Sequence, residues 1–174
     1  HCGLVGSEMC IRDRVEVAPI RAPVKLQRLD AHGWRFSNEW LEVDCGPGGL
    51  LQLRDSQGVD QLAGPLQPTR FEDRGEFWDA WDLAADYRSH PLEVQVSGPC
   101  ELLEHGPLVV HAVQRYRLGS SVMRLDMRLQ ADCPWLELIC SIDWSQRHEL
   151  LRLELPLASA AVRYAADSAG TVLE

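Results

Sequence analysis

Residues 123–130 alternate strictly between apolar and polar side chains, and this pattern constrains the fold more than any other feature of the sequence. The apolar members are Met123, Leu125, Met127 and Leu129, and the polar members are Arg124, Asp126, Arg128 and Gln130. Successive side chains of a β-strand point to opposite faces of the sheet, so this spacing puts all the apolar side chains on one face. The segment therefore predicts a strand with one buried face and one solvated face.

The same period of two continues on both sides of this segment. Residues 136–144 and 149–157 carry apolar side chains at every second position, and residues 107–118 do so except at Gln114. Turn signals at 119–120 and 132–134 separate these segments. Consecutive antiparallel strands with one wet face each are typical of a layer of a β-sandwich. We therefore predict an all-β fold, an antiparallel β-sandwich.

Upstream, a glycine-rich turn separates two further strand-like stretches. Residues 34–44 and 50–54 flank Gly46-Pro47-Gly48-Gly49, which predicts a hairpin with a longer loop. Residues 55–91 are rich in glycine and proline and predict a long irregular loop, a type of segment that often carries function.

The chain divides into three parts. Residues 1–14 fit neither strand nor helix periodicity and resemble translated sequencing-adapter DNA, so we expect them to be non-native and exclude them from the fold. Residues 15–33 contain two prolines and predict a linker or extended segment. Residues 34–174 form the predicted β-sandwich domain.

Composition excludes several classes of protein. The 174 residues carry a net charge of −9, and an acidic surface repels phosphate backbones, which argues against a nucleic-acid partner. No apolar run approaches the roughly 18 residues that a membrane-spanning helix needs, so we expect no membrane partner. The six cysteines include no C-x-x-C pair, which argues against a zinc ribbon or a thioredoxin-like site. Their irregular spacing does not fit a disulfide scaffold and favours free thiols in a reducing cytoplasm. Cys133 and Cys140, which flank a predicted strand, are expected to be packing residues.

Several motifs of catalysis and metal binding are missing. The sequence has no glycine-rich phosphate loop, no G-x-S-x-G and no H-E-x-x-H. Its six histidines are scattered singly, and a lone histidine on a strand or loop is usually structural. The residues alone therefore support neither a metal site nor a catalytic triad.

The segment from Phe71 to Asp82 has the composition of a sugar-binding site. Its twelve residues, FEDRGEFWDAWD, include five carboxylates and four aromatic side chains. Aromatic faces stack on the apolar faces of a pyranose, and carboxylates accept hydrogen bonds from its hydroxyl groups. The alternative is that Phe77 and Trp78 or Trp81 anchor the loop in the core while the acids are solvated. Composition leaves both readings open.

The same segment resembles the D-A-W-D block of glycoside hydrolase family 38, the retaining α-mannosidases, especially the bacterial type. The family pattern F-E-D-R-P-x-x-W-D-A-W-D-I-D matches here except that Gly75 replaces the proline and Leu83-Ala84 replaces Ile-Asp. Two further stretches resemble family blocks in the expected order. They are residues 38–43 together with 49–55, and residues 142–153.

The resemblance implies a domain similar to galactose mutarotase, incomplete at its C-terminus, from a bacterial cytoplasmic enzyme that hydrolyses terminal α-mannosides. The zinc ion, its ligands and the nucleophile would lie on a missing N-terminal barrel domain, so no catalytic or metal-binding residue is expected in this chain. The resemblance implies that the D-A-W-D loop lines the sugar pocket. That role falls on Asp79, Trp81 and Asp82, with Trp78 in support.

Other residues of the matched blocks receive a structural role. Asp143, Trp144 and His148 are assigned to packing and loop geometry. The alternative function is a carbohydrate-binding or purely structural mutarotase-like module of another carbohydrate enzyme.

Overall fold

The computed structural model describes residues 22–75, 82–160, 166–168 and 171–173, with side chains for the first two ranges. Within these ranges the regular structure is almost entirely β-strand, apart from the single 3₁₀ turn η1 (Tyr87–Ser89). The strands are β1 (Lys25–Arg28), β2 (Trp34–Ser37), β3 (Leu41–Gly46), β4 (Gly49–Asp55), β5 (Gln67–Glu72), β6 (Pro91–Leu92), β7 (Gln95–His105), β8 (Val109–Leu118), β9 (Ser121–Gln130), β10 (Glu137–Asp143), β11 (Glu149–Glu154), β12 (Ala166–Ser168) and β13 (Thr171–Leu173). No helix in the described part of the chain is long and apolar enough to cross a membrane.

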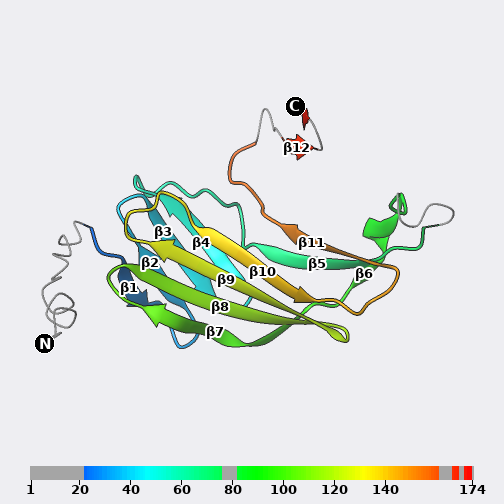
Figure 1. Ribbon diagram of the computed structural model, residues 1–174, viewed down its shortest axis with the longest axis horizontal. Helices are drawn as coiled ribbons and strands as arrows, with labels where there is room; N and C mark the ends of the chain where they lie inside the picture. Colours follow the sequence, from blue (N-terminus) through cyan, green and yellow to red (C-terminus); the bar gives the residue numbers. More distant parts are fainter. Residues whose placement is uncertain (1–21, 76–81, 161–165, 169–170, 174) are drawn as a thin grey trace, which may run out of the picture.

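The strands form antiparallel sheets (Figure 1). The first sheet has the order β1-β2-β3-β4 and the second has the order β10-β9-β8-β7. A third sheet, β11-β5-β6, extends to one side of these two, and β12 pairs with β13. The predicted all-β, antiparallel fold is confirmed.

The core lies between the first and second sheets. Phe36 and Val43, which are cross-strand partners on β2 and β3, are fully buried. They belong to the same apolar cluster as Leu125 and Met127 of β9. Burial of these side chains drives the two sheets together, so they pack as the two layers of a sandwich. The apolar face predicted for residues 123–129 is thus the inner face of the second sheet.

The hairpin at Gly46–Gly49 is confirmed, but residues 34–44 are two strands rather than one. Asn38 separates β2 from β3, because its side-chain oxygen accepts hydrogen bonds from the backbone N–H groups of Trp40 and Leu41, both at 2.9 Å. Such a side chain replaces the bonds of a strand ladder and reverses the chain.

The first sheet begins earlier in the chain than residue 34. Lys25–Arg28, inside the segment predicted to be a linker or extended, forms β1 and pairs with β2. All four residues of β1 are exposed at the sheet edge, so they show no apolar alternation that could reveal a strand.

The prediction that residues 55–91 form one irregular loop is wrong. The segment contains β5 (Gln67–Glu72), which pairs with β11 over six residues, and Pro91 begins β6. The sequence of β5 lacks a clear alternation, and its main partner lies far along the chain. Pairing with β11 therefore defines this strand more than its own residues do.

The predicted packing role holds for Cys133, which is buried, and is wrong for Cys140, which is exposed. Cys140 lies on β10, the edge strand of the second sheet. An edge position leaves its side chain less covered by the opposite layer.

Candidate functional site

The carboxylate-rich and aromatic segment follows directly from β5. Phe71 and Glu72 end that strand. Residues 76–81 lie outside the described residues, so three of the predicted pocket residues, Trp78, Asp79 and Trp81, cannot be placed. The fourth, Asp82, is exposed, and its Oδ1 accepts a hydrogen bond of 2.9 Å from the backbone N–H of Leu83.

One buried carboxylate joins the two ends of this segment. Asp73 is only 8% exposed. Its Oδ1 accepts a hydrogen bond of 2.9 Å from the backbone N–H of Ala84, eleven residues further along the chain. The backbone N–H of Asp73 in turn donates to the carbonyl of His148 at 2.8 Å. Asp73 therefore holds residues 73 and 84 together and ties both to the strand that follows His148.

Sheet pairing brings together two of the sequence blocks that resemble family 38. In the β5–β11 ladder, Phe71 lies opposite Leu150 and Glu72 lies opposite Glu149. His148, just before β11, has a left-handed backbone with φ of 54°. This conformation is uncommon for residues other than glycine. The carbonyl of His148 accepts the hydrogen bond from Asp73, so this histidine takes part in the geometry of the loop. Trp144 is 37% exposed, so most of its surface is covered.

An ion pair between a buried arginine and a partly buried glutamate supports the same strands. Arg70 of β5 is 9% exposed, and its Nε lies 3.2 Å from Oε2 of Glu149 on β11. Its Nη1 would lie only 3.0 Å from a Cβ at Gly119, in the turn between β8 and β9. Arg70 therefore ends close to the turn between β8 and β9, and a side chain larger than that of glycine at position 119 would require a neighbouring side chain to move.

An aromatic and cationic cluster lies beside the segment. The rings of Phe71 and Tyr87 meet edge to face with centroids 5.3 Å apart. The Tyr87 hydroxyl accepts hydrogen bonds from Arg152 at 2.5 Å and from Arg88 at 3.1 Å. The hydrogen bond from Arg88, together with the charge of Arg152, lowers the pKa of Tyr87. An open hollow of about 810 Å³, bordered by Phe71, Arg88, Arg152 and Glu154, adjoins this cluster.

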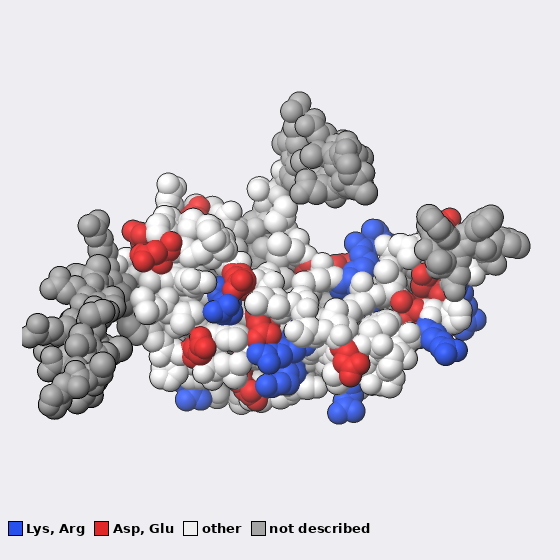
Figure 2. Space-filling view, in the orientation of Figure 1, with Lys and Arg blue, Asp and Glu red and all other residues white. Residues whose placement is uncertain are grey.

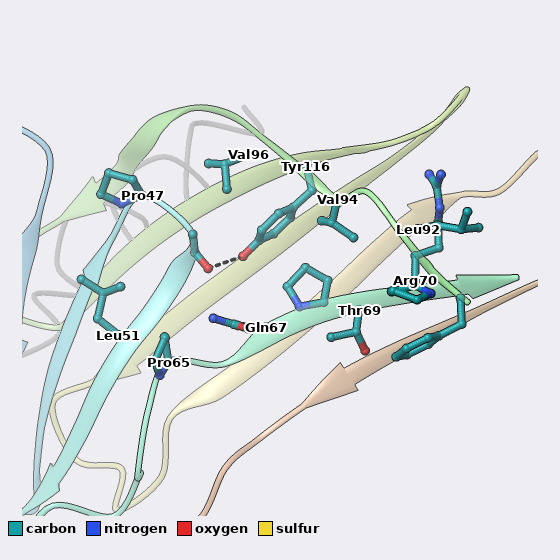
Figure 3. A pocket seen from close by; sticks show the side chains of 14 residues that line it. Pro47, Leu51, Pro65, Gln67, Thr69, Arg70, Leu92, Val94, Val96 and Tyr116 are labelled. Atoms are coloured by element: carbon teal, nitrogen blue, oxygen red, sulfur yellow. Dashed lines mark hydrogen bonds between the residues drawn. The ribbon is translucent and has the colours of Figure 1, made fainter. Parts of the chain in front are cut away.

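A second hollow, of about 420 Å³, lies between β5, the β3–β4 turn and β8 (Figure 3). Its lining is mostly apolar. The lining side chains that Figure 3 labels are Pro47, Leu51, Pro65, Gln67, Thr69, Arg70, Leu92, Val94, Val96 and Tyr116. The Tyr116 hydroxyl donates a hydrogen bond of 2.7 Å to the carbonyl of Gly48. Burial raises the pKa of Tyr116, so its hydroxyl stays protonated as a donor and fixes the turn.

The described residues do not fit a zinc ion. Within them, no group of three or more histidine, cysteine, aspartate or glutamate side chains lies close enough together to hold a metal. Zinc sites in proteins need three or four such ligands.

The sequence singles out the segment from Phe71 to Asp82 as a candidate site but does not indicate which residues fix its ends. Asp73 belongs to the matched motif, yet its bond to His148 depends on the pairing of β5 with β11. Tyr87 lies in the segment that the sequence predicted to be a loop. No local signal in the sequence indicates its contacts with Phe71 and Arg152.

The face seen in Figure 2 carries acidic and basic side chains in small mixed groups, without a large patch of one sign.

The fold and the candidate site together define a β-sandwich domain with a carboxylate-rich aromatic segment at one end. Residues 36–174 match the C-terminal domain of the glycosyl hydrolases of family 38. The chain belongs to this family, as its sequence blocks predicted. No curated protein sequence matches the chain.

Proposed function

We propose that this chain is part of a zinc-dependent, retaining α-mannosidase of the bacterial cytoplasm, and that it forms one wall of the pocket for a terminal α-mannoside. The observation that carries the proposal is the pair of hydrogen bonds at Asp73, which we call the Asp73 clamp. Asp73 accepts from the backbone N–H of Ala84 and donates its own backbone N–H to the carbonyl of His148, so the two ends of the family-specific segment are held together at its base. A closed base reduces the conformational freedom of the residues between its ends. Less ordering entropy then opposes their binding to a sugar.

Each residue of the wall has a separate role in this proposal. Asp79 and Asp82 accept hydrogen bonds from sugar hydroxyl groups, Trp81 stacks on the pyranose ring, and Trp78 supports it. The chain binds and orients the substrate, while the zinc ion and the nucleophile belong to a barrel domain that docks beside it. Because the described residues do not fit zinc, we derive no catalytic step for them.

The proposal is tested in the full-length enzyme with para-nitrophenyl α-mannoside as the substrate. We expect Trp81→Ala and Asp82→Asn to lower kcat/KM by about 10- to 100-fold each, since each removes a contact with the sugar. Glu93→Gln, an exposed carboxylate outside the segment, is the matched control and should leave kcat/KM unchanged. Wild-type kcat/KM in both pocket variants would show that the segment does not line the site.

The 174-residue chain by itself should bind mannosides weakly and hydrolyse none. Zinc-dependent release of mannose by the purified chain would contradict this division of roles.

The alternative function is a carbohydrate-binding module. The hollow beside Phe71, Arg88 and Arg152 favours it, because the hollow combines an aromatic side chain with hydrogen-bond donors. Titration of mannosides against tryptophan fluorescence, with Trp81→Ala as the comparison, separates binding by the segment from binding elsewhere.

A further inference from the structure

Two buried cysteines meet between the layers of the sandwich. Cys45 of β3 and Cys100 of β7 are 0% and 4% exposed, and their Sγ atoms lie 3.6 Å apart within a hydrogen bond. The strands that carry them belong to different sheets and lie against each other. Both thiols are free. A disulfide needs an S–S length of about 2.05 Å, so the sulfurs must approach by roughly 1.5 Å.

The backbone at both cysteines is irregular, which allows this approach. The register of β3 with β4 shifts between Asp44 and Cys45. The register of β7 with β8 shifts between Ser97 and Glu101, so Cys100 lies in a stretch without regular ladder partners. Within that stretch Gly98 has a φ of 75°. Bulges of this kind move more easily than a regular ladder because they carry fewer inter-strand hydrogen bonds.

The position of β7 gives a reagent a route to the pair. β7 is the edge strand of the second sheet, so only one neighbouring strand holds it. Local opening of an edge strand exposes Cys100 before Cys45, which lies on an inner strand of its own sheet. The hydrogen bond with Cys45 lowers the pKa of Cys100, whereas the hydrogen bond with Cys100 and burial raise the pKa of Cys45. Because opening of the edge strand exposes Cys100 first, Cys100 is the attacking thiol.

We propose that Cys45 and Cys100 form a dithiol pair that a small disulfide, such as oxidised glutathione, converts into a covalent bridge between the two sheets. The Cys100 thiolate attacks oxidised glutathione, forming a mixed disulfide and releasing one glutathione thiolate. The Cys45 thiolate then attacks the sulfur of Cys100, which forms the bridge and releases the second glutathione thiolate. The two released thiolates take up the two protons lost by the cysteines, and the protein is oxidised by two electrons while glutathione is reduced.

The bridge changes stability in a predictable direction. It links residues that are 55 positions apart and so restricts the unfolded chain. It also ties the edge strand β7 to the opposite layer. We expect the Tm of the oxidised chain to exceed that of the reduced chain by about 5–10 °C, and dithiothreitol to reverse the shift.

The experiment equilibrates the purified, folded chain with oxidised glutathione, blocks the remaining thiols and digests with trypsin without reduction. Cleavage after arginine separates the pair into peptides 36–54 and 89–115, each with a single cysteine. The expected result is one linked peptide whose mass is lower than the sum of the two by two hydrogen atoms. Linkage only in urea, or glutathione attached to Cys100 without linkage to Cys45, would overturn the proposal.

Variants separate this pair from the other thiols. In a background where Cys2, Cys10, Cys133 and Cys140 are all serine, the linked peptide and the rise in Tm should persist. Adding Cys100→Ala to that background should abolish both. The peptide map of the wild-type chain decides the proposal even if a variant does not fold.

Discussion

β9 and β10 are neighbours in one sheet and carry the same alternation of apolar side chains, yet their burial differs sharply. Leu125 of β9 is 0% exposed, whereas Ile142 of β10 is 46% exposed. The ladder places Cys140 beside Leu125 and Ile142 beside Met123, so all four side chains point to the same face. The alternation therefore shows which face a side chain occupies, and the opposite layer decides whether that face is covered.

The third sheet shows the same difference on a larger scale. Leu153 of β11 is 41% exposed although it follows the predicted alternation. The sheet β11-β5-β6 extends past the two packed layers (Figure 1). A side chain in the sandwich core should therefore contribute more to the free energy of unfolding than a side chain in the third sheet.

The largest effect is expected in the core. Leu125→Ala removes a fully buried side chain between two layers that cannot close over the cavity, and should lower the free energy of unfolding by about 3–4 kcal/mol. Urea denaturation followed by circular dichroism measures it. A loss below about 1 kcal/mol would mean that the two layers do not pack as described.

An intermediate effect is expected at the ion-pair network of the first sheet. Asp44 accepts hydrogen bonds from Arg35 at 2.6 Å and Arg54 at 2.9 Å. Burial opposes the charge of Asp44, but these hydrogen bonds outweigh it and lower the pKa. Asp44→Asn should cost about 1–2 kcal/mol at neutral pH, since it weakens two charge-assisted bonds.

The pH dependence has a definite sign. An aspartate in the unfolded chain ionises near pH 4. Because the pKa of Asp44 is lower in the folded state, its contribution to the free energy of unfolding is complete above about pH 4 and is lost as the pH falls through the folded-state pKa. The urea midpoint of Asp44→Asn should therefore fall less steeply than that of the wild type below pH 4. Asp132→Asn, at an exposed turn, is the control and should follow the wild type. Parallel curves for Asp44→Asn and the wild type would contradict the role of the network.

The smallest effect is expected in the third sheet. Leu153→Ala removes a side chain that already contacts solvent, so we expect a loss below about 1 kcal/mol. The same urea experiment measures it, with Leu125→Ala as its counterpart. If the two substitutions cost the same, the contrast between the core and the third sheet is wrong.

The strands with strong local periodicity were predictable. The alternation at 107–118, 123–130 and 149–157 located β8, β9 and β11, and the glycines at 46–49 located the hairpin. β1 and β5 were missed for different reasons. β1 is exposed throughout, and β5 depends on a partner more than seventy residues away.

The site was predictable only as a segment. Its carboxylates and aromatic residues stand together in the sequence, so composition and family resemblance both single it out as a candidate site. The clamp of Asp73 with Ala84 and His148, the ion pair of Arg70 and Glu149, and the contact of Phe71 with Tyr87 were not predictable. Each joins residues that are separated in the sequence, and no local pattern specifies these contacts.

The sequence by itself determined the all-β class, the face of each regular strand and the family, because side-chain alternation and motif spacing are local properties of the chain. Only the tertiary structure decided which faces are covered, which strand pairs with β5 and which thiols meet. Those properties depend on contacts between distant segments, whose free energy comes from the packing of the layers against each other.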